Sequence, residues 1–460
     1  MPTLHREVTL GNMLTIAFPL VVSQGSETLM LFFNRYFVSF LGSDFIPASM
    51  SGGLTLFVFT SFFGGIVGYV NALAAQYHGA GRPERCVQAV SQGLLLSVVF
   101  YPVLLALIPL VHLGFGWAGH NPRLVGLEFS YFRILMFGSF IFLAQGVLAG
   151  YFIGLGKTRT VMLASFLGIF VNVPLTWILT LGRLGIPRFG IEGAAIGTLC
   201  GSFSTVAILI VAYLHSPAYR DHHGHGAWKP RGEMLARLLR YGGPAGAEVF
   251  ISVFAFNLFI LLMQSYSPSV ATAVTITFNY DLVAFIPMLG VGAAVTSLAA
   301  QRMGAGDVRG ARRAAYLGLR VAWSYASIMV IAFVVGAPVL VRVFAGGFGA
   351  GDQDILPLAQ KLLRLAALYT LADATQVVFS GALRGAGDTK WVMIIAVTLH
   401  WVMAIGAFIL IRVLVVPPVA VWLFFIGFVV SMGLAMYLRH RSGVWQNIRI
   451  VESAPPALAG

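Results

Sequence analysis

The sequence predicts an all-α integral membrane protein whose twelve transmembrane helices form two pseudo-symmetric six-helix bundles. Three observations support this fold class. The 460 residues are 58% hydrophobic and only 10% charged, whereas soluble domains carry about 25% charged residues. Apolar runs recur along the whole chain, and each is long enough to cross about 30 Å of hydrocarbon. Motifs of the first half also return in the second half at a nearly constant offset.

The apolar runs are loosely bounded, because Pro or Gly interrupts several of them. They cover about 12–40, 47–74, 90–114, 127–154, 161–181, 190–214, 243–264, 270–298, 321–341, 362–383, 391–411 and 418–438. With the N-terminus inside, 20 of the 29 Lys and Arg residues fall in cytoplasmic loops and termini, and seven fall outside. This bias predicts a multi-pass protein of the cell (inner or plasma) membrane with both termini in the cytoplasm. The net charge of +13 therefore reflects topology and predicts no nucleic-acid partner.

The repeat divides the chain. AQYHGAG (75–81) returns as AQRMGAG (300–306) at an offset of 225, and GLGKTRTVM (154–162) returns as GAGDTKWVM (385–393) at an offset of 231. Because each unit holds six spans, an even number, the two copies are parallel repeats about an axis along the membrane normal. The sequence predicts an N-terminal bundle (1–214), a cytoplasmic linker (215–241), a C-terminal bundle (242–440) and a cytoplasmic tail (441–460).

Two ligand-like motifs are better explained as structure. GLGKT lacks the earlier Gly of a phosphate-binding loop, because Tyr151 stands there, so a tight turn is predicted instead. His222, His223 and His225 could bind a metal, but no Cys or carboxylate cluster completes a site, which favours a solvated linker. Cys86 and Cys200 are isolated and predict no disulfide framework. No cofactor is expected apart from a transported H⁺ or Na⁺.

Four acids lie well inside predicted spans, namely Glu27, Glu248, Asp281 and Asp373, and the other twelve lie in loops, tails or helix ends. A charged side chain at bilayer depth costs about 2.5–3.5 kcal/mol on the mildest scale, so each must face water, pair with a partner or stay protonated. Asp373 is the strongest candidate, since LADATQVVFSG (371–381) is otherwise apolar and Gln376 follows one helical turn later on the same face. Asp281 lies near the outer third of its span.

The first span also carries a polar track. Ser23, Glu27 and Asn34 lie along one side of the helix, and Glu27 and Asn34 are two turns, or about 10 Å, apart. Arg35 flanks this track and could pair with one of the acids, which would be a structural role.

LADATQVVFSGALRGAGDTK (371–390), the two Q-x-x-GAG turns and the twelve spans in two halves resemble the multidrug and toxic compound extrusion (MATE) transporters. The resemblance covers residues 10 to 440. It implies two six-helix bundles around a V-shaped central cavity, from which cationic and often aromatic compounds leave the cell in exchange for Na⁺ or H⁺. Asp373 matches the tenth-span acid that family members use for cation coupling.

The sequence departs from the family pattern at other positions. The first-span Asp of the family falls at Asn34, and the fifth-span Asn and Asp of one branch fall at Asn172 and Thr176. The seventh-span Glu falls at Ser252, with Glu248 one turn earlier. The resemblance and the buried charges together lead us to expect Asp373, Glu248 and Glu27 as the cation-coupling or proton-coupling acids, with a possible Na⁺ at Asp373. The expected substrate cavity is lined by Asn34, Gln376, Asn172, Thr176, Asp281 and Ser252.

The function expected from these observations is secondary antiport that exports small organic, cationic, drug-like compounds. One alternative is a flippase or exporter of a lipid-linked saccharide from the same broad superfamily, which predicts a basic cavity for pyrophosphate. A membrane-embedded transferase is a remote alternative, because no convergent nucleophile or acid–base set is evident. A channel built from static halves is a further possibility. The expected partners of a monomer are a small-molecule substrate, a coupling cation and the lipid bilayer, and no enzyme activity is expected.

Overall fold

The computed structural model describes residues 7–42, 44–117, 121–222, 228–343 and 355–451. All regular elements in these ranges are helical. The first repeat unit holds α1 (Leu10–Ser39), α2 (Phe45–Gly68), α3 (Val70–Gly79), α4 (Pro83–Ala106), α5 (Ile108–Trp117), α6 (Pro122–Phe137), α7 (Ser139–Gly154), α8 (Thr158–Leu181) and α9 (Ile191–Leu214). A short α10 (Pro217–His222) follows. The second unit holds α11 (Gly232–Gln264), α12 (Pro268–Gly304), α13 (Val308–Arg342), α14 (Ile355–Ala386), α15 (Thr389–Phe408), a π-helical turn (Ile409–Val413), α16 (Pro418–Arg441) and a final 3₁₀ turn (Val444–Asn447).

The predicted spans are confirmed within the described residues. Eleven helices or helix pairs are long and apolar enough to cross a membrane, and α6 with α7 forms a twelfth span bent by 49°. The bend lies at Gly138, where the helix is interrupted between Phe137 and Ser139. The hydropathy pattern predicts one unbroken span here, because a break at a single position leaves the apolar composition unchanged.

Two helices of the second unit begin well before their predicted apolar runs. α11 begins at Gly232 rather than near 243, because Glu233 and Arg237 form an ion pair one turn apart and Met234 and Leu238 are buried. α13 begins at Val308 rather than near 321, where the side chain of Asp307 accepts a hydrogen bond from the Gly310 amide at 2.7 Å. These polar turns extend the helices beyond the apolar windows. The predicted bundle and linker boundaries stay a prediction.

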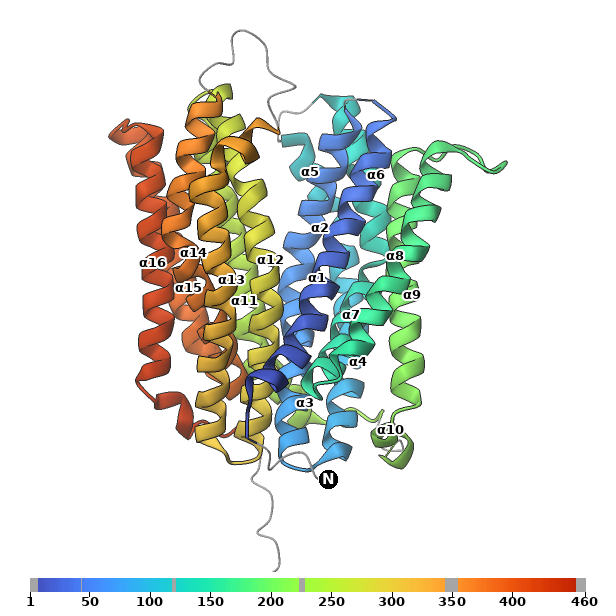
Figure 1. The fold of residues 1–460 in the computed structure, drawn as a ribbon. Coiled ribbons are helices and arrows are strands. Elements are labelled where there is room, and N and C mark those ends of the chain that lie inside the picture. The colour runs from blue at the N-terminus through green and yellow to red at the C-terminus, as the bar shows by residue number, and fades with distance from the viewer. Residues whose placement is uncertain (1–6, 43, 118–120, 223–227, 344–354, 452–460) are drawn as a thin grey trace, which may run out of the picture.

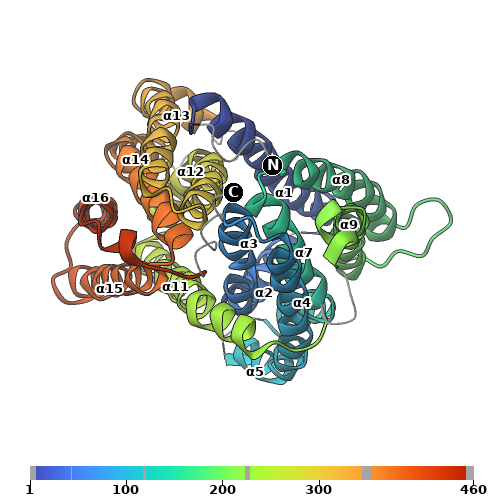
Figure 2. The same ribbon diagram turned by 90° about the horizontal axis from the view of Figure 1, so that it is seen from below.

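The two units lie side by side as two groups of helices (Figures 1 and 2). They meet where α1 packs against α12 and where α2 packs against α11, and α3 and α7 also contact α12. Glycine permits the close approach of α2 and α11, since a Cβ on Gly65 would be 2.8 Å from the Gly246 amide nitrogen. This two-fold arrangement of contacts agrees with the repeat found in the sequence.

Four glycine turns form two pairs related by the repeat, and all four glycines have a positive φ. Gly81, Gly156, Gly306 and Gly387 have φ of 70°, 73°, 76° and 97°, a left-handed region that only glycine enters without strain. Gly156 belongs to GLGKT, so this motif forms the tight turn between α7 and α8. We call the side of the molecule that carries these four turns the turn face; it lies at the bottom of Figure 1 and is the predicted cytoplasmic side.

The end of the described chain crosses the turn face from α16 toward α3 (Figure 2). We call residues 444–451 the C-terminal strap. Trp445 packs into a core cluster formed mainly by the second unit, whereas Ile450 and Val451 pack into a cluster formed mainly by the first unit. The strap also lines a cavity of about 560 Å³ between the Gly81 and Gly306 turns. The predicted tail therefore includes a segment that joins the two bundles.

Candidate functional site

Two acids of the second unit come together between α12 and α14. Asp281 of α12 accepts a hydrogen bond from the buried Tyr369 hydroxyl of α14 at 2.8 Å. Asp373 follows Tyr369 by one turn on α14, so Tyr369 lies between the two acids along this contact. Glycine brings the two helices together, because a Cβ on Gly381 would be 2.6 Å from the Gly292 carbonyl oxygen. The structure thus ties Asp281 to the helix that carries Asp373, one turn before that acid.

Asp373 is half-buried and has neither a hydrogen bond nor an ion pair within the described ranges. Gln376, predicted on the same face, is also half-buried. A carboxylate that lies among apolar helices without a cationic neighbour favours binding of a cation or a proton.

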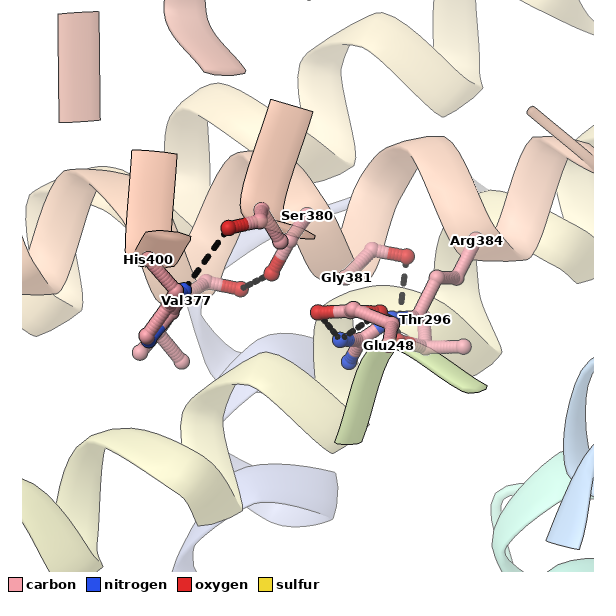
Figure 3. A network of polar contacts seen from close by, with 8 residues as sticks. Glu248, Thr296, Val377, Ser380, Gly381, Arg384 and His400 are labelled. Carbon is pink, nitrogen blue, oxygen red and sulfur yellow. Dashed lines mark hydrogen bonds and ion pairs between the residues drawn. The ribbon is translucent and has the colours of Figure 1, made fainter. Parts of the chain in front are cut away.

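Glu248 has a different environment, because its charge is balanced within the protein. Its carboxylate, on α11, is buried and meets the Arg384 guanidinium of α14, with Nη2 2.6 Å and Nε 3.2 Å from Oε2 (Figure 3). Two-point contacts of this kind are geometrically specific. The predicted span 362–383 ends just before Arg384, whereas Arg384 lies within the last turn of α14 and reaches back to a span acid.

The ion pair belongs to a polar layer near the turn face of the second unit (Figure 3). Thr296 of α12 donates to the Gly381 or the Gly292 carbonyl, each at 3.0 Å. His400 of α15 lies beside Ser380, and its Nδ1 is 2.8 Å from the carbonyl of Ala396 in its own helix. Ser252, one turn beyond Glu248 on α11, has a buried hydroxyl without a partner in the described structure.

The N-terminal positions implied by the family resemblance do assemble, but as a neutral cluster. Asn34 of α1 donates to the Thr198 hydroxyl of α9 at 2.7 Å and accepts from the Thr176 hydroxyl of α8 at 3.1 Å. All three side chains are buried. Asn172 lies one turn before Thr176, and both of its buried amide atoms lack a partner among the described residues. The cluster can hold a neutral polar group, and it offers no carboxylate.

Glu27 lies two turns before Asn34 and faces a separate pocket. Its Oε1 is 3.5 Å from Nε2 of Gln145 on α7, and its side chain is exposed. The pocket has a volume of about 20 Å³. Its lining also includes Ser165 and Gly168 of α8 and Ser202 and Thr205 of α9. Arg35, which could have paired with a span acid, makes no ion pair with any described acid.

A pair of glutamines closes the turn face between the bundles. Gln76 of α3 donates to the Gly385 carbonyl of α14 at 2.8 Å, and Gln301 of α12 donates to the Gly154 carbonyl of α7 at 2.7 Å. The sequence numbers of the donors differ by 225 and those of the acceptors by 231, so the two bonds are related by the repeat. We call Gln76 and Gln301 the glutamine pair. Each bond joins one bundle to the other.

Sequence reasoning missed the glutamine pair and the partner of Glu248. The shared Gln of AQYHGAG and AQRMGAG was a signal for the first; no signal for the second existed, since pairing depends on helix register. Glu128, at the start of the predicted span 127–154, is buried within α6. No cluster of three or more metal-ligating side chains was found among the described residues. His223 and His225 of the predicted linker lie outside them.

Comparison of this chain with known protein families supports the two-repeat arrangement. A family model described as MatE matches residues 19–178 and 244–409. The starts of the two matches differ by 225 in sequence number and their ends by 231, the same offsets as the repeat motifs, which confirms the duplication.

Solved structures share the fold. A crystal structure of MATE in complex with MaL6 is 21% identical and superposes with a TM-score of 0.84 over 97% of this chain and 98% of that chain. An outward-facing multidrug resistance MATE family transporter of the MOP superfamily is 22% identical, with a TM-score of 0.83 over 95% and 97%. A MOP superfamily transporter from Pyrococcus furiosus Vc1, described as having a binding pocket of reverse polarity that suggests a different function, is 21% identical, with a TM-score of 0.86 over 97% and 98%. The twelve-helix fold in two repeats is thereby confirmed.

Proposed function

The chain belongs to the MATE family of membrane transporters, and from this membership we propose that it is a secondary antiporter that exports small cationic, drug-like compounds in exchange for H⁺ or Na⁺. We place it in the cell membrane as a monomer with both termini in the cytoplasm, as its charge bias predicts. Such a transporter requires a substrate, a coupling cation and a lipid bilayer, and it requires no resident cofactor.

One observation carries the proposal: Asp281 bonds to Tyr369, one turn before Asp373 on α14, and Asp373 has no cationic partner in the described chain. A site with this surplus of negative charge attracts either a small inorganic cation or an organic one. When both cannot be held at once, binding of one lowers the affinity for the other by the same factor. This competition supplies the coupling between export of the compound and entry of the ion.

Glu248 and Glu27 take different parts in this proposal. The Arg384 guanidinium already balances Glu248, so we assign Glu248 to holding α11 to the last turn of α14. Glu27 has no such cation, and it remains a second coupling acid. The neutral residues Asn34, Asn172 and Thr176 remain candidates for substrate contact.

Alternating access requires that the turn face opens and closes. The glutamine pair and the C-terminal strap bridge the bundles there, which supports a conformation closed toward the cytoplasm. We propose that these bridges break when the two bundles rock to receive substrate from the cytoplasm.

The test is efflux of a cationic dye from proteoliposomes under an imposed Na⁺ or pH gradient. Wild-type protein is expected to move dye uphill in one of these gradients, whereas Asp373→Asn is expected to lose uphill movement. Uphill transport at full rate by Asp373→Asn would refute the role of this acid, and downhill leakage alone in the wild type would indicate a channel.

Export of a lipid-linked saccharide is the second candidate, since a structural neighbour is described as having a pocket of reverse polarity. A pyrophosphate group would meet the charges of Asp281 and Asp373 and be repelled. The acids therefore favour cationic cargo over this alternative.

A further inference from the structure

We propose that two arginines on the perimeter of the molecule, Arg133 of α6 and Arg364 of α14, each bind the phosphate of an anionic phospholipid. The lipids lie in the leaflet opposite the turn face, which is the predicted outer leaflet. The offset of 231 relates the two arginines, so the repeat places one such site in each bundle. The inference depends neither on the coupling acids nor on the ion that drives transport.

Both arginines lie on a helix face that the rest of the protein leaves uncovered. The side chains of Arg133 and Arg364 are exposed. One turn later on the same face, Phe137 is 55% exposed and Leu368 is 62% exposed, and the offset of 231 relates these two residues as well. Large apolar side chains exposed within a membrane span contact lipid. The arginine beside each of them therefore faces lipid too.

The surroundings of Arg133 place it on the surface that α5 and α6 form. Its guanidinium carbon lies 5.9 Å from the centroid of the Phe129 ring, and the ring of His112 on α5 lies 4.2 Å from the same Phe129 ring, between centroids. Figure 2 shows α5 at the edge of the molecule. α6 itself packs on α2, α5 and α9 of its own unit. Arg133 is thus directed to the perimeter of the first bundle.

Arg364 lies beside a second cation. Lys361 precedes it by one turn on the same helix face, and its side chain is also exposed. α14 reaches the edge of the molecule between α13 and α16 (Figure 2). Neither arginine makes an ion pair or a hydrogen bond with any residue that the structure describes. Their charges are therefore not balanced within the described chain.

The length of the helices sets the depth of the two arginines. In both units, 23 residues separate the arginine from a left-handed glycine of the turn face, Gly156 after Arg133 and Gly387 after Arg364. This stretch of α-helix spans about 35 Å, slightly more than the hydrocarbon thickness of about 30 Å. With the turn face at one membrane surface, Arg364 reaches the headgroups of the opposite leaflet. The bend between α6 and α7 leaves Arg133 somewhat deeper.

The chemistry at this depth selects the partner. Side chains of a helix lean toward its N-terminus, which points both arginines away from the turn face and toward the headgroups. A guanidinium without a counterion is unfavourable in hydrocarbon, and the anion present at this level is the lipid phosphate, which arginine binds through two parallel hydrogen bonds. Because no described acid is paired with these arginines, the site offers nothing to the ammonium group of a zwitterionic lipid. A lipid of net negative charge is therefore favoured.

The experiment counts the phospholipids that purified protein retains in native mass spectrometry after incubation with equal amounts of phosphatidylglycerol and phosphatidylcholine. Wild type is expected to retain phosphatidylglycerol in preference. Arg133→Gln and Arg364→Gln should each weaken one phosphatidylglycerol about fivefold, equivalent to about 1 kcal/mol, the contribution of one cation near an anionic lipid surface. Arg364→Gln with Lys361→Gln should weaken it about 25-fold. The control Arg123→Gln removes an exposed arginine about 15 Å farther out along α6 and should match wild type.

Equal retention of the two lipids by wild type would overturn the proposal, as would unchanged phosphatidylglycerol affinity in the double variant Arg133→Gln with Arg364→Gln. Arg364→Lys keeps the charge and is expected to retain most of the affinity, so a loss as large as that of Arg364→Gln would also contradict binding through charge. If a glutamine variant fails to fold, Arg133→Met and Arg364→Met, whose side chains suit a lipid-facing position, take its place with the same expected losses.

Discussion

Replacing both members of the glutamine pair with leucine should open the turn face. Gln76→Leu and Gln301→Leu keep the side-chain size but remove the bonds to Gly385 and Gly154 that join the bundles. A buried hydrogen bond contributes about 0.5–1.5 kcal/mol. Taking about 1 kcal/mol for each, one substitution shifts the closed-to-open equilibrium about fivefold and both shift it about 30-fold.

The assay is thiol labelling at Ser297→Cys in a background with Cys86→Ser and Cys200→Ser. Ser297 is fully buried between the bundles, where it bonds to the Ile153 carbonyl at 2.6 Å. A water-soluble maleimide therefore reaches this position only when the turn face opens, so the labelling rate reports the open population. The control is Gln88→Leu, because Gln88 contacts Arg85 within its own helix. An unchanged labelling rate in the double leucine variant would refute the assignment of the glutamine pair as the closure of this face.

Three further outcomes follow from the same contacts. Arg384→Met should destabilise the protein by about 3–5 kcal/mol, because it leaves the buried charge of Glu248 unpaired. The double variant Arg384→Met with Glu248→Gln should recover most of this loss. Equal thermal unfolding midpoints for the single and double variants would contradict the ion pair. Ile450→Asn removes an apolar anchor of the C-terminal strap worth about 1.5–3 kcal/mol, so Ser297→Cys should label faster, and a wild-type rate would rule out a role for the strap in closure. Asp281→Asn should weaken competition between dye and cation while leaving some uphill export, measured as dye efflux against the coupling ion.

The helices and the repeat could be predicted from the sequence, because a bilayer imposes length and apolarity on each span and because the duplication preserved its glycine turns. Asp373 could be singled out for the same reason, since a carboxylate stands out in an apolar helix. The pairing of Glu248 with Arg384 could not be predicted, because it depends on how α11 and α14 rotate against each other. Asp281 and Asp373 are also far apart in the sequence, and only the packing of α12 on α14 links them, through Tyr369.

The N-terminal bundle shows the limit of transferring a pattern by alignment. Asn34, Asn172 and Thr176 were expected at the substrate cavity, and they form a closed neutral cluster or lie next to it. Whether substrate reaches them stays a prediction. On α1 the acid is Glu27, two turns before Asn34, and its surroundings became clear only once α7, α8 and α9 were in place around it.

Release of the coupling cation on addition of substrate tests the central claim most directly. Purified protein is equilibrated with radioactive Na⁺, or with a pH indicator in weak buffer, and a cationic dye is added. We predict that the dye displaces Na⁺ or protons from wild-type protein and displaces fewer from Asp373→Asn. Dye binding that leaves the bound cation in place, or equal release from both proteins, would contradict exchange at Asp373.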